Sequence, residues 1–153
     1  MCLICNPKDI EQFVKGGKST FTLTSKVTGS RYTYRVSQIC NGDKRYDKWS
    51  VSLLTGPNNN TDFTYLGMIN NEGQGHKDEL TLTTKSKMTL DSKPVRAFVF
   101  LCQKVLQKKQ NPENVGLEFR HMNKCGRCNR PLTVPESIDT GFGPDCADIL
   151  GIG

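Results

Sequence analysis

The sequence predicts an α+β fold in which an antiparallel β-meander of about five strands packs on one long helix and carries a small cysteine-rich C-terminal module. Three observations predict this class. The first half of the chain alternates apolar and polar residues, which is typical of strands with one buried face. The period changes to helical spacing over residues 92–109, and residues 125–146 then open with C-x2-C and end on a third cysteine.

The alternating segments are the predicted strands of the meander. In the second of them, Tyr32, Tyr34 and Val36 fall on one face. It follows the turn VTGS, in which Gly29 can adopt a positive φ. GPNNNTD, further on, is a loop of turn-forming residues. The predicted strands are residues 20–26, 31–37, 49–54, 63–69 and 80–84.

The helix is predicted from apolar residues at positions 95, 98, 99, 102, 105 and 106, which fall on one helical face. Ser92 or Asp91 can cap its start, and Pro94 is tolerated in the first turn. We expect NPEN at 111–114 to end it, and VGLEF at 115–119 to lead on as a short extended piece.

The C-terminal segment carries signals for two short helices. TVPE at 133–136 fits a capping box with Thr133 as N-cap and Glu136 at N3, and Gly141 suits the end of that helix. GPDCADIL at 143–150 predicts a second helix that presents Cys146 in its first turn. We therefore divide the chain into a sheet-and-helix domain, residues 1–114, and a module of residues 115–153.

Three cysteines of this module predict a metal site. Cys125 and Cys128 form a knuckle, and Cys146 follows at a distance that a hairpin or short helix can span. Thiolates are ligands of tetrahedral structural zinc, which needs four protein groups. His121 is the predicted fourth ligand, which makes this a zinc-knuckle module with one structural Zn²⁺. Asp148, the distant pair Cys2 and Cys5, and an open position are the alternatives that the spacing leaves.

The charge of the chain is unevenly distributed. The net charge is +6 over 153 residues; residues 92–131 carry nine Lys or Arg against two acids, and residues 132–153 carry none against four. Such an asymmetry favours a polyanionic partner, although a solvated basic face explains it equally well. The candidate nucleic-acid-binding residues around the knuckle are Lys108, Lys109, Arg120, Lys124, Arg127 and Arg130.

The stretch CGRCNRPLTVPESIDTGFGPDCA resembles an uncharacterised zinc-binding domain family that is common in phage and prophage proteins. The family pattern is C-G-x-C-x-R-x-L-T-x-P-x-S-I-x-x-G-x-G-P-x-C-A, and the likeness covers only about 25 residues of the chain. The upstream strands also look like the segment that precedes this motif in some phage-associated proteins. The resemblance implies a phage protein that acts in the bacterial host cytoplasm, and it implies no established activity.

Two functions compete. The first is non-specific binding of DNA or RNA by a basic surface that the zinc orders, with Tyr32, Tyr34, Phe63 and Tyr65 either forming the sheet core or stacking on bases. The second is binding and inhibition of a host defence or regulatory protein, with a purely structural zinc module. We expect no catalysis, because His76 lies in a glycine-rich loop and the common catalytic motifs are absent. We expect no small-molecule substrate. We also expect no membrane association, since the chain has no long apolar run and no secretory signal.

Overall fold

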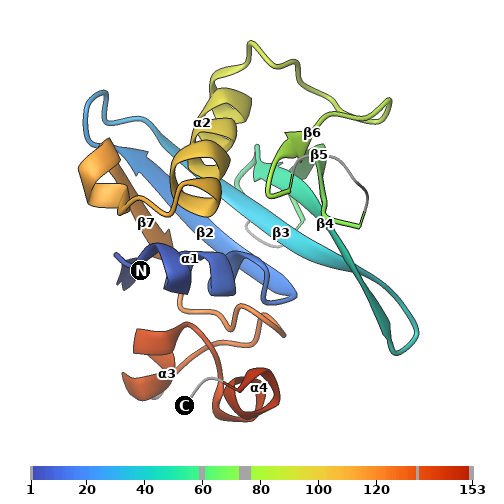
Figure 1. Cartoon of the computed structure of the whole chain (residues 1–153), viewed down its shortest axis with the longest axis vertical. Coiled ribbons are helices and arrows are strands. Elements are labelled where there is room, and N and C mark those ends of the chain that lie inside the picture. Colours follow the sequence, from blue (N-terminus) through green and yellow to red (C-terminus); the bar gives the residue numbers. More distant parts are fainter. Residues whose placement is uncertain (1, 59–60, 73–76, 134, 152–153) are drawn as a thin grey trace.

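The computed structural model describes the chain except for residues 1, 59–60, 73–76, 134 and 152–153. A seven-stranded antiparallel sheet with strand order β1-β7-β2-β3-β4-β5-β6 forms its centre (Figure 1). Strands β2 to β6 follow one another as a meander, so the predicted antiparallel sheet and the α+β class are confirmed. The strands are β1 Cys2–Ile4, β2 Lys18–Ser25, β3 Arg31–Asn41, β4 Lys44–Leu54, β5 Phe63–Asn70, β6 Leu80–Thr81 and β7 Leu117–His121.

Local turn chemistry sets the register at the tip of the longest hairpin, and a bulge between Gln38 and Cys40 shifts the pairing beyond it. Strands β3 and β4 pair from Tyr34 with Leu53 to Asn41 with Lys44, which leaves a two-residue loop. Gly42, the first loop residue, has a φ of 62°, a conformation that glycine adopts without steric cost. Buried and half-exposed residues alternate along β4, so one side of this hairpin faces the core.

Two helices cover one face of the sheet (Figure 1). Helix α1, Pro7–Val14, begins where the Asn6 side chain accepts a hydrogen bond from the Lys8 amide at 2.8 Å, and it was not predicted. Helix α2, Lys93–Leu101, occupies the first part of the predicted helix. Below them, Phe21 stacks on Phe119 with ring centroids 4.5 Å apart.

The single long helix predicted over residues 92–109 is not what the structure has. Helix α2 has nine residues and continues as a π-helical segment, η1, Cys102–Gln107. The wider turns of η1 are seen where Lys108 donates its amide to the Gln103 carbonyl, five residues back. A 3-10 turn, η2, Pro112–Val115, then leads into β7. At the start of α2, the side chain of the N-cap residue Ser92 makes no capping hydrogen bond.

The opposite face of the sheet is polar. There the Thr22 and Thr33 hydroxyls lie 2.7 Å apart across β2 and β3. The Arg35 guanidinium lies 4.1 Å from the ring centroid of the half-buried Phe63, whereas Tyr34 is fully buried in the core. The predicted aromatic set is therefore divided between the two faces of the sheet.

Two short helices follow the sheet, as the sequence predicts. Helix α3, Pro135–Thr140, and helix α4, Pro144–Leu150, lie at one end of the molecule (Figure 1). Val134 is outside the described residues, so the capping box at Thr133 stays a prediction. The division at residues 114 and 115 also stays a prediction; β7, from the second segment, pairs with both β1 and β2. In the described part of the chain, no helix combines the length and apolar character needed to cross a bilayer.

Candidate metal centre

Three cysteines converge beyond the end of the sheet. The sulfur atoms of Cys125, Cys128 and Cys146 all lie within 4.8 Å of one another, and this is the group among the described residues that could hold a metal ion. The knuckle is held by two backbone hydrogen bonds of 2.8 Å, from the Cys125 amide to Arg130 and from the Asn129 amide back to Cys125. Helix α4 supplies the third sulfur from its first turn. The predicted cysteine cluster is confirmed.

N–H donors point at two of these sulfur atoms. The amides of Arg127 and Gly143 each donate to Cys125 Sγ at 3.4 Å. Burial opposes ionisation of Cys125, but these amides and that of Cys128 outweigh it and lower the pKa of this thiol. Arg127 Nη1 also donates to Cys146 Sγ at 3.7 Å. Burial raises the pKa of the Cys146 thiol; the Arg127 hydrogen bond opposes this, and the neighbouring Cys128 and Cys125 add to it.

The chemistry of this donor set fits a soft or borderline cation. Three thiolates at such separations repel one another, and a divalent ion between them removes that repulsion. Sulfur ligands select zinc and related metals over magnesium or calcium. The amide donors and the Arg127 guanidinium then stabilise the negative charge that three thiolates leave around one divalent ion.

His121, the predicted fourth ligand, is not a member of this group. Its side chain is fully buried; Nε2 lies 2.6 Å from the Ile138 carbonyl oxygen, and Nδ1 accepts the Asn123 amide at 3.0 Å. A ring nitrogen that accepts an N–H carries no proton, so the proton is on Nε2 and is donated to Ile138. Burial lowers the pKa of His121, which favours this neutral form. The ring lies 5.6 Å from that of Phe13, and the side chain joins the module to α1.

The other ligand alternatives are not brought to the sulfur atoms either. Asp148 is exposed on α4 and is not in the group. Cys5 is an exposed free thiol, and the Cys2 side chain lies outside what the structure describes. Within the described residues, the candidate site is therefore a three-cysteine site.

Close packing against α1 holds the two halves of the site together. Gly126 donates its amide to the Gly141 carbonyl at 2.8 Å, which joins the knuckle to the end of α3. A Cβ on Gly126 would lie 2.8 Å from Phe13, and one on Gly141 would lie 2.7 Å from the same ring. The buried Phe142 ring adds a further contact, 5.8 Å from Phe13. Phe13 of the unpredicted α1 is thus the platform on which the module docks.

The segment that carries the cysteines matches a known sequence family. Residues 116–151 match DUF6011, a family of unknown function. The match runs from the glycine before β7 to the end of α4, so it contains all three clustered cysteines and leaves most of the sheet outside. No curated protein and no solved structure matches the chain. The match carries no activity and no source, so the phage association and the host-cytoplasm location stay predictions.

The predicted cations do not form one free surface. Lys109 pairs with Glu11 at 2.6 Å, and Arg120 pairs with Glu118 at 3.3 Å. Arg127 points to Cys146, and Lys124 is half-buried. Of the six candidates, Lys108 and Arg130 are the exposed ones that pair with no carboxylate among the described residues.

Two cations that were not predicted border the knuckle instead. The Lys18 amide donates to the Gly126 carbonyl at 2.9 Å, which places the start of β2 against the knuckle. A Cβ on Gly17 would meet both Arg45 Nη1 at 3.2 Å and the Arg127 carbonyl oxygen at 3.0 Å. Lys18 and Arg45 are both exposed. No local sequence signal could identify them, because they lie on β2 and β4, which are far from the knuckle in the sequence.

Proposed function

We propose that Cys125, Cys128 and Cys146 bind one structural zinc ion, and that the ion orders a basic surface for non-specific binding of nucleic acid. The observation that carries this proposal is the convergence of three sulfur atoms within 4.8 Å beside exposed cations from separate segments. We define the basic surface by Lys18, Arg45 and Arg130.

The zinc would supply stability to a segment that has little core of its own. Residues 122–151 form two short helices and a hairpin-like knuckle around few large apolar side chains. Metal binding in such a segment contributes directly to its folding free energy. The described residues provide three ligands, so the fourth protein ligand of a structural zinc would come from a group outside them.

The basic surface suits contact with phosphates rather than with bases. Its three cations lie on β2, on β4 and in the knuckle, and the docking of the knuckle on Gly17 and Lys18 fixes their spacing. Lys and Arg side chains in this arrangement neutralise phosphates and release counterions, which gives affinity that depends on salt more than on sequence.

The test is binding of a fluorescent oligonucleotide, single-stranded and then double-stranded, over a series of salt concentrations. In the triple variant Lys18→Ala/Arg45→Ala/Arg130→Ala, loss of three phosphate contacts should reduce the slope of log K against log salt by about 2 to 3. The matched control is Lys77→Ala/Lys85→Ala/Lys87→Ala, which removes equal charge at exposed positions before and after β6, the edge strand of the sheet.

An equal effect of the two variants would reject this surface as the binding site. Zinc content, measured for both variants, would show whether the cysteine-rich module is intact. Unchanged oligonucleotide binding in the triple variant, together with a nuclease-resistant complex with a host protein, would support the competing function as a protein inhibitor.

A further inference from the structure

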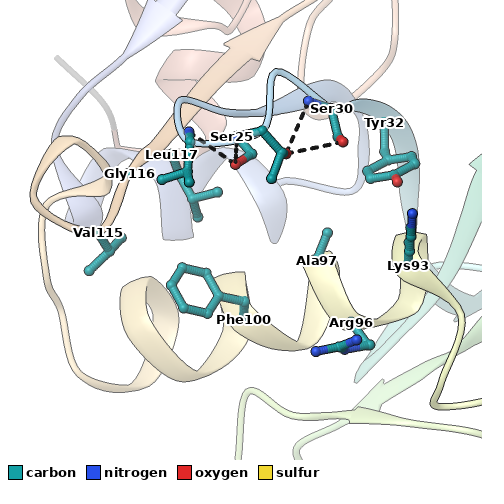
Figure 2. A pocket seen from close by; sticks show the side chains of 12 residues that line it. Ser25, Ser30, Tyr32, Lys93, Arg96, Ala97, Phe100, Val115, Gly116 and Leu117 are labelled. Carbon is teal, nitrogen blue, oxygen red and sulfur yellow. Dashed lines mark hydrogen bonds between the residues drawn. The ribbon is translucent and has the colours of Figure 1, made fainter.

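A groove lies on the other side of the molecule from the cysteines. It runs between α2, the turn that joins β2 to β3, and the start of β7, and its volume is about 470 Å³ (Figure 2). Pockets that enclose small organic molecules fall in the range of about 300 to 1,000 Å³. None of the residues that line the groove belongs to the cysteine site or to the basic surface.

The body of the groove is apolar. Phe100 and Ala97 extend from α2 toward the turn, and Leu117 and Val115 line one end (Figure 2). Val27 stands in the turn and is 86% exposed, and Phe100 is half-buried. A ligand that covers these side chains would remove apolar surface from water, which is favourable.

The polar groups that line the groove are hydrogen-bond donors and cations. Lys93 and Tyr32 stand together at one end; Arg96, one helical turn further along α2, also borders the groove, but its guanidinium extends away from the turn (Figure 2). Both cations are exposed, and in the described chain neither pairs with a carboxylate. No described Asp or Glu lines the groove.

Two hydroxyl groups on the opposite wall have hydrogen atoms to donate. Ser25 Oγ accepts the amides of Val27 at 3.3 Å and Thr28 at 3.2 Å, and Ser30 Oγ accepts the Thr28 hydroxyl at 3.1 Å. Neither serine donates its hydroxyl hydrogen to another described residue. The groove therefore offers an apolar surface, the Lys93 ammonium at one end, the positive charge of Arg96 at its border and two O–H donors, with no described carboxylate.

We propose that this groove binds a small carboxylate that has an apolar body. The apolar body lies on Phe100, Ala97 and Val27, and the carboxylate is at the end that carries Lys93. A neutral or cationic molecule of the same shape gains nothing from the two cations. The groove was not foreseen from the sequence, because its walls come from three segments that are far apart along the chain.

The experiment is an NMR titration of the full chain with octanoate, 1-octanol and octylammonium, which share one apolar body and differ in charge. Octanoate should shift the amide signals of Val27, Ala97 and Val115, and it should bind several-fold more tightly than the alcohol. Lys93→Ala/Arg96→Ala should weaken octanoate binding about three- to tenfold and abolish its advantage over octanol. Lys87→Ala, another exposed cation, is the control.

Val27→Ser tests the apolar half of the proposal. The side chain is exposed, so this variant should fold normally and bind all three probes more weakly. The proposal is overturned if octanol binds as tightly as octanoate, or if the shifts fall elsewhere. It is also overturned if inorganic phosphate shifts the same amides with an affinity equal to that of octanoate. None of these outcomes bears on zinc content or oligonucleotide binding.

Discussion

At the scale of single residues, the metal site depends on which polar atoms are already committed to other partners. Each nitrogen of the His121 ring has a backbone partner, whereas N–H groups donate to the sulfur atoms of Cys125 and Cys146. A buried acceptor that loses its donor costs about 1–3 kcal/mol, so His121 is held in place by the bonds that it already makes. The thiols, in contrast, gain from a cation.

The first prediction concerns Cys146. Cys146→Ser removes the sulfur that α4 contributes, and a hydroxyl is a poor substitute for a thiolate as a zinc ligand. We expect protein purified without added zinc to contain about one zinc ion per chain in the wild type, and far less in the variant, as measured by plasma mass spectrometry. Cys40→Ser, at an exposed free thiol, is the control and should keep its zinc.

The second prediction separates a ligand from a structural residue. His121→Ala deletes two hydrogen bonds and the contact with Phe13, and it should lower the free energy of unfolding by about 2–4 kcal/mol. Zinc content should stay near that of the wild type once the protein is folded. Loss of zinc from the folded variant would instead identify His121 as the fourth ligand.

At the scale of secondary structure, the strongly periodic segments could be predicted and the short or composite ones could not. The alternation of β2 to β5 and the cysteine spacing are local patterns, so the meander and the cluster followed from them. Helix α1 has eight residues and only Asn6 and Pro7 to mark its start. The apolar spacing over η1 is that of a helix, but this spacing does not distinguish the wider π-helical turn from an α-helical one.

The third prediction tests how α1 supports the module. Gly141 has a φ of +82°, and an alanine Cβ there would lie 2.7 Å from Phe13. Gly141→Ala combines a left-handed backbone, which costs about 1–2 kcal/mol in a residue with a Cβ, with displacement of that ring. We expect a lower unfolding temperature. We also expect faster loss of zinc to a chelator whose absorbance measures the released metal.

A neighbouring glycine provides the control for this variant. Gly143 has a φ of −65° and no atom within 4 Å of the Cβ position, and its amide would still be present to donate to Cys125. Gly143→Ala should therefore release zinc at the wild-type rate. If the two variants behave alike, the docking of the module on Phe13 does not determine how firmly the metal is held.

At the scale of the whole molecule, a network of ion pairs joins parts of the chain that are far apart in sequence. Lys15 Nζ, just after α1, lies 2.9 Å from Glu11 and 2.5 Å from Asp78, which precedes β6. Lys109, beyond η1, pairs with the other oxygen of Glu11. The network therefore ties α1 to the far edge of the sheet and to the end of the helical segment.

The network predicts that the protein loses stability in acid. Burial opposes the charge on Asp78, but hydrogen bonds from Lys15 and Asn71 outweigh it and lower the pKa of this carboxyl. For Glu11, burial is likewise outweighed by Lys109 and Lys15, and its pKa is also lowered. A carboxyl with a depressed pKa in the folded state stabilises the protein above its unfolded pKa, and this contribution is lost as the pH falls through the folded pKa.

The urea midpoint should therefore fall as the pH drops from 6 to about 3, across the ordinary carboxyl range. Asp78→Asn should lower the midpoint at pH 6, because Lys15 stays partly buried without its closest partner, and it should flatten the fall in acid. Asp43→Asn, in the exposed β3–β4 loop, keeps the network and should follow the wild-type curve. Parallel curves for Asp78→Asn and the wild type would show that the acid sensitivity arises elsewhere in the molecule.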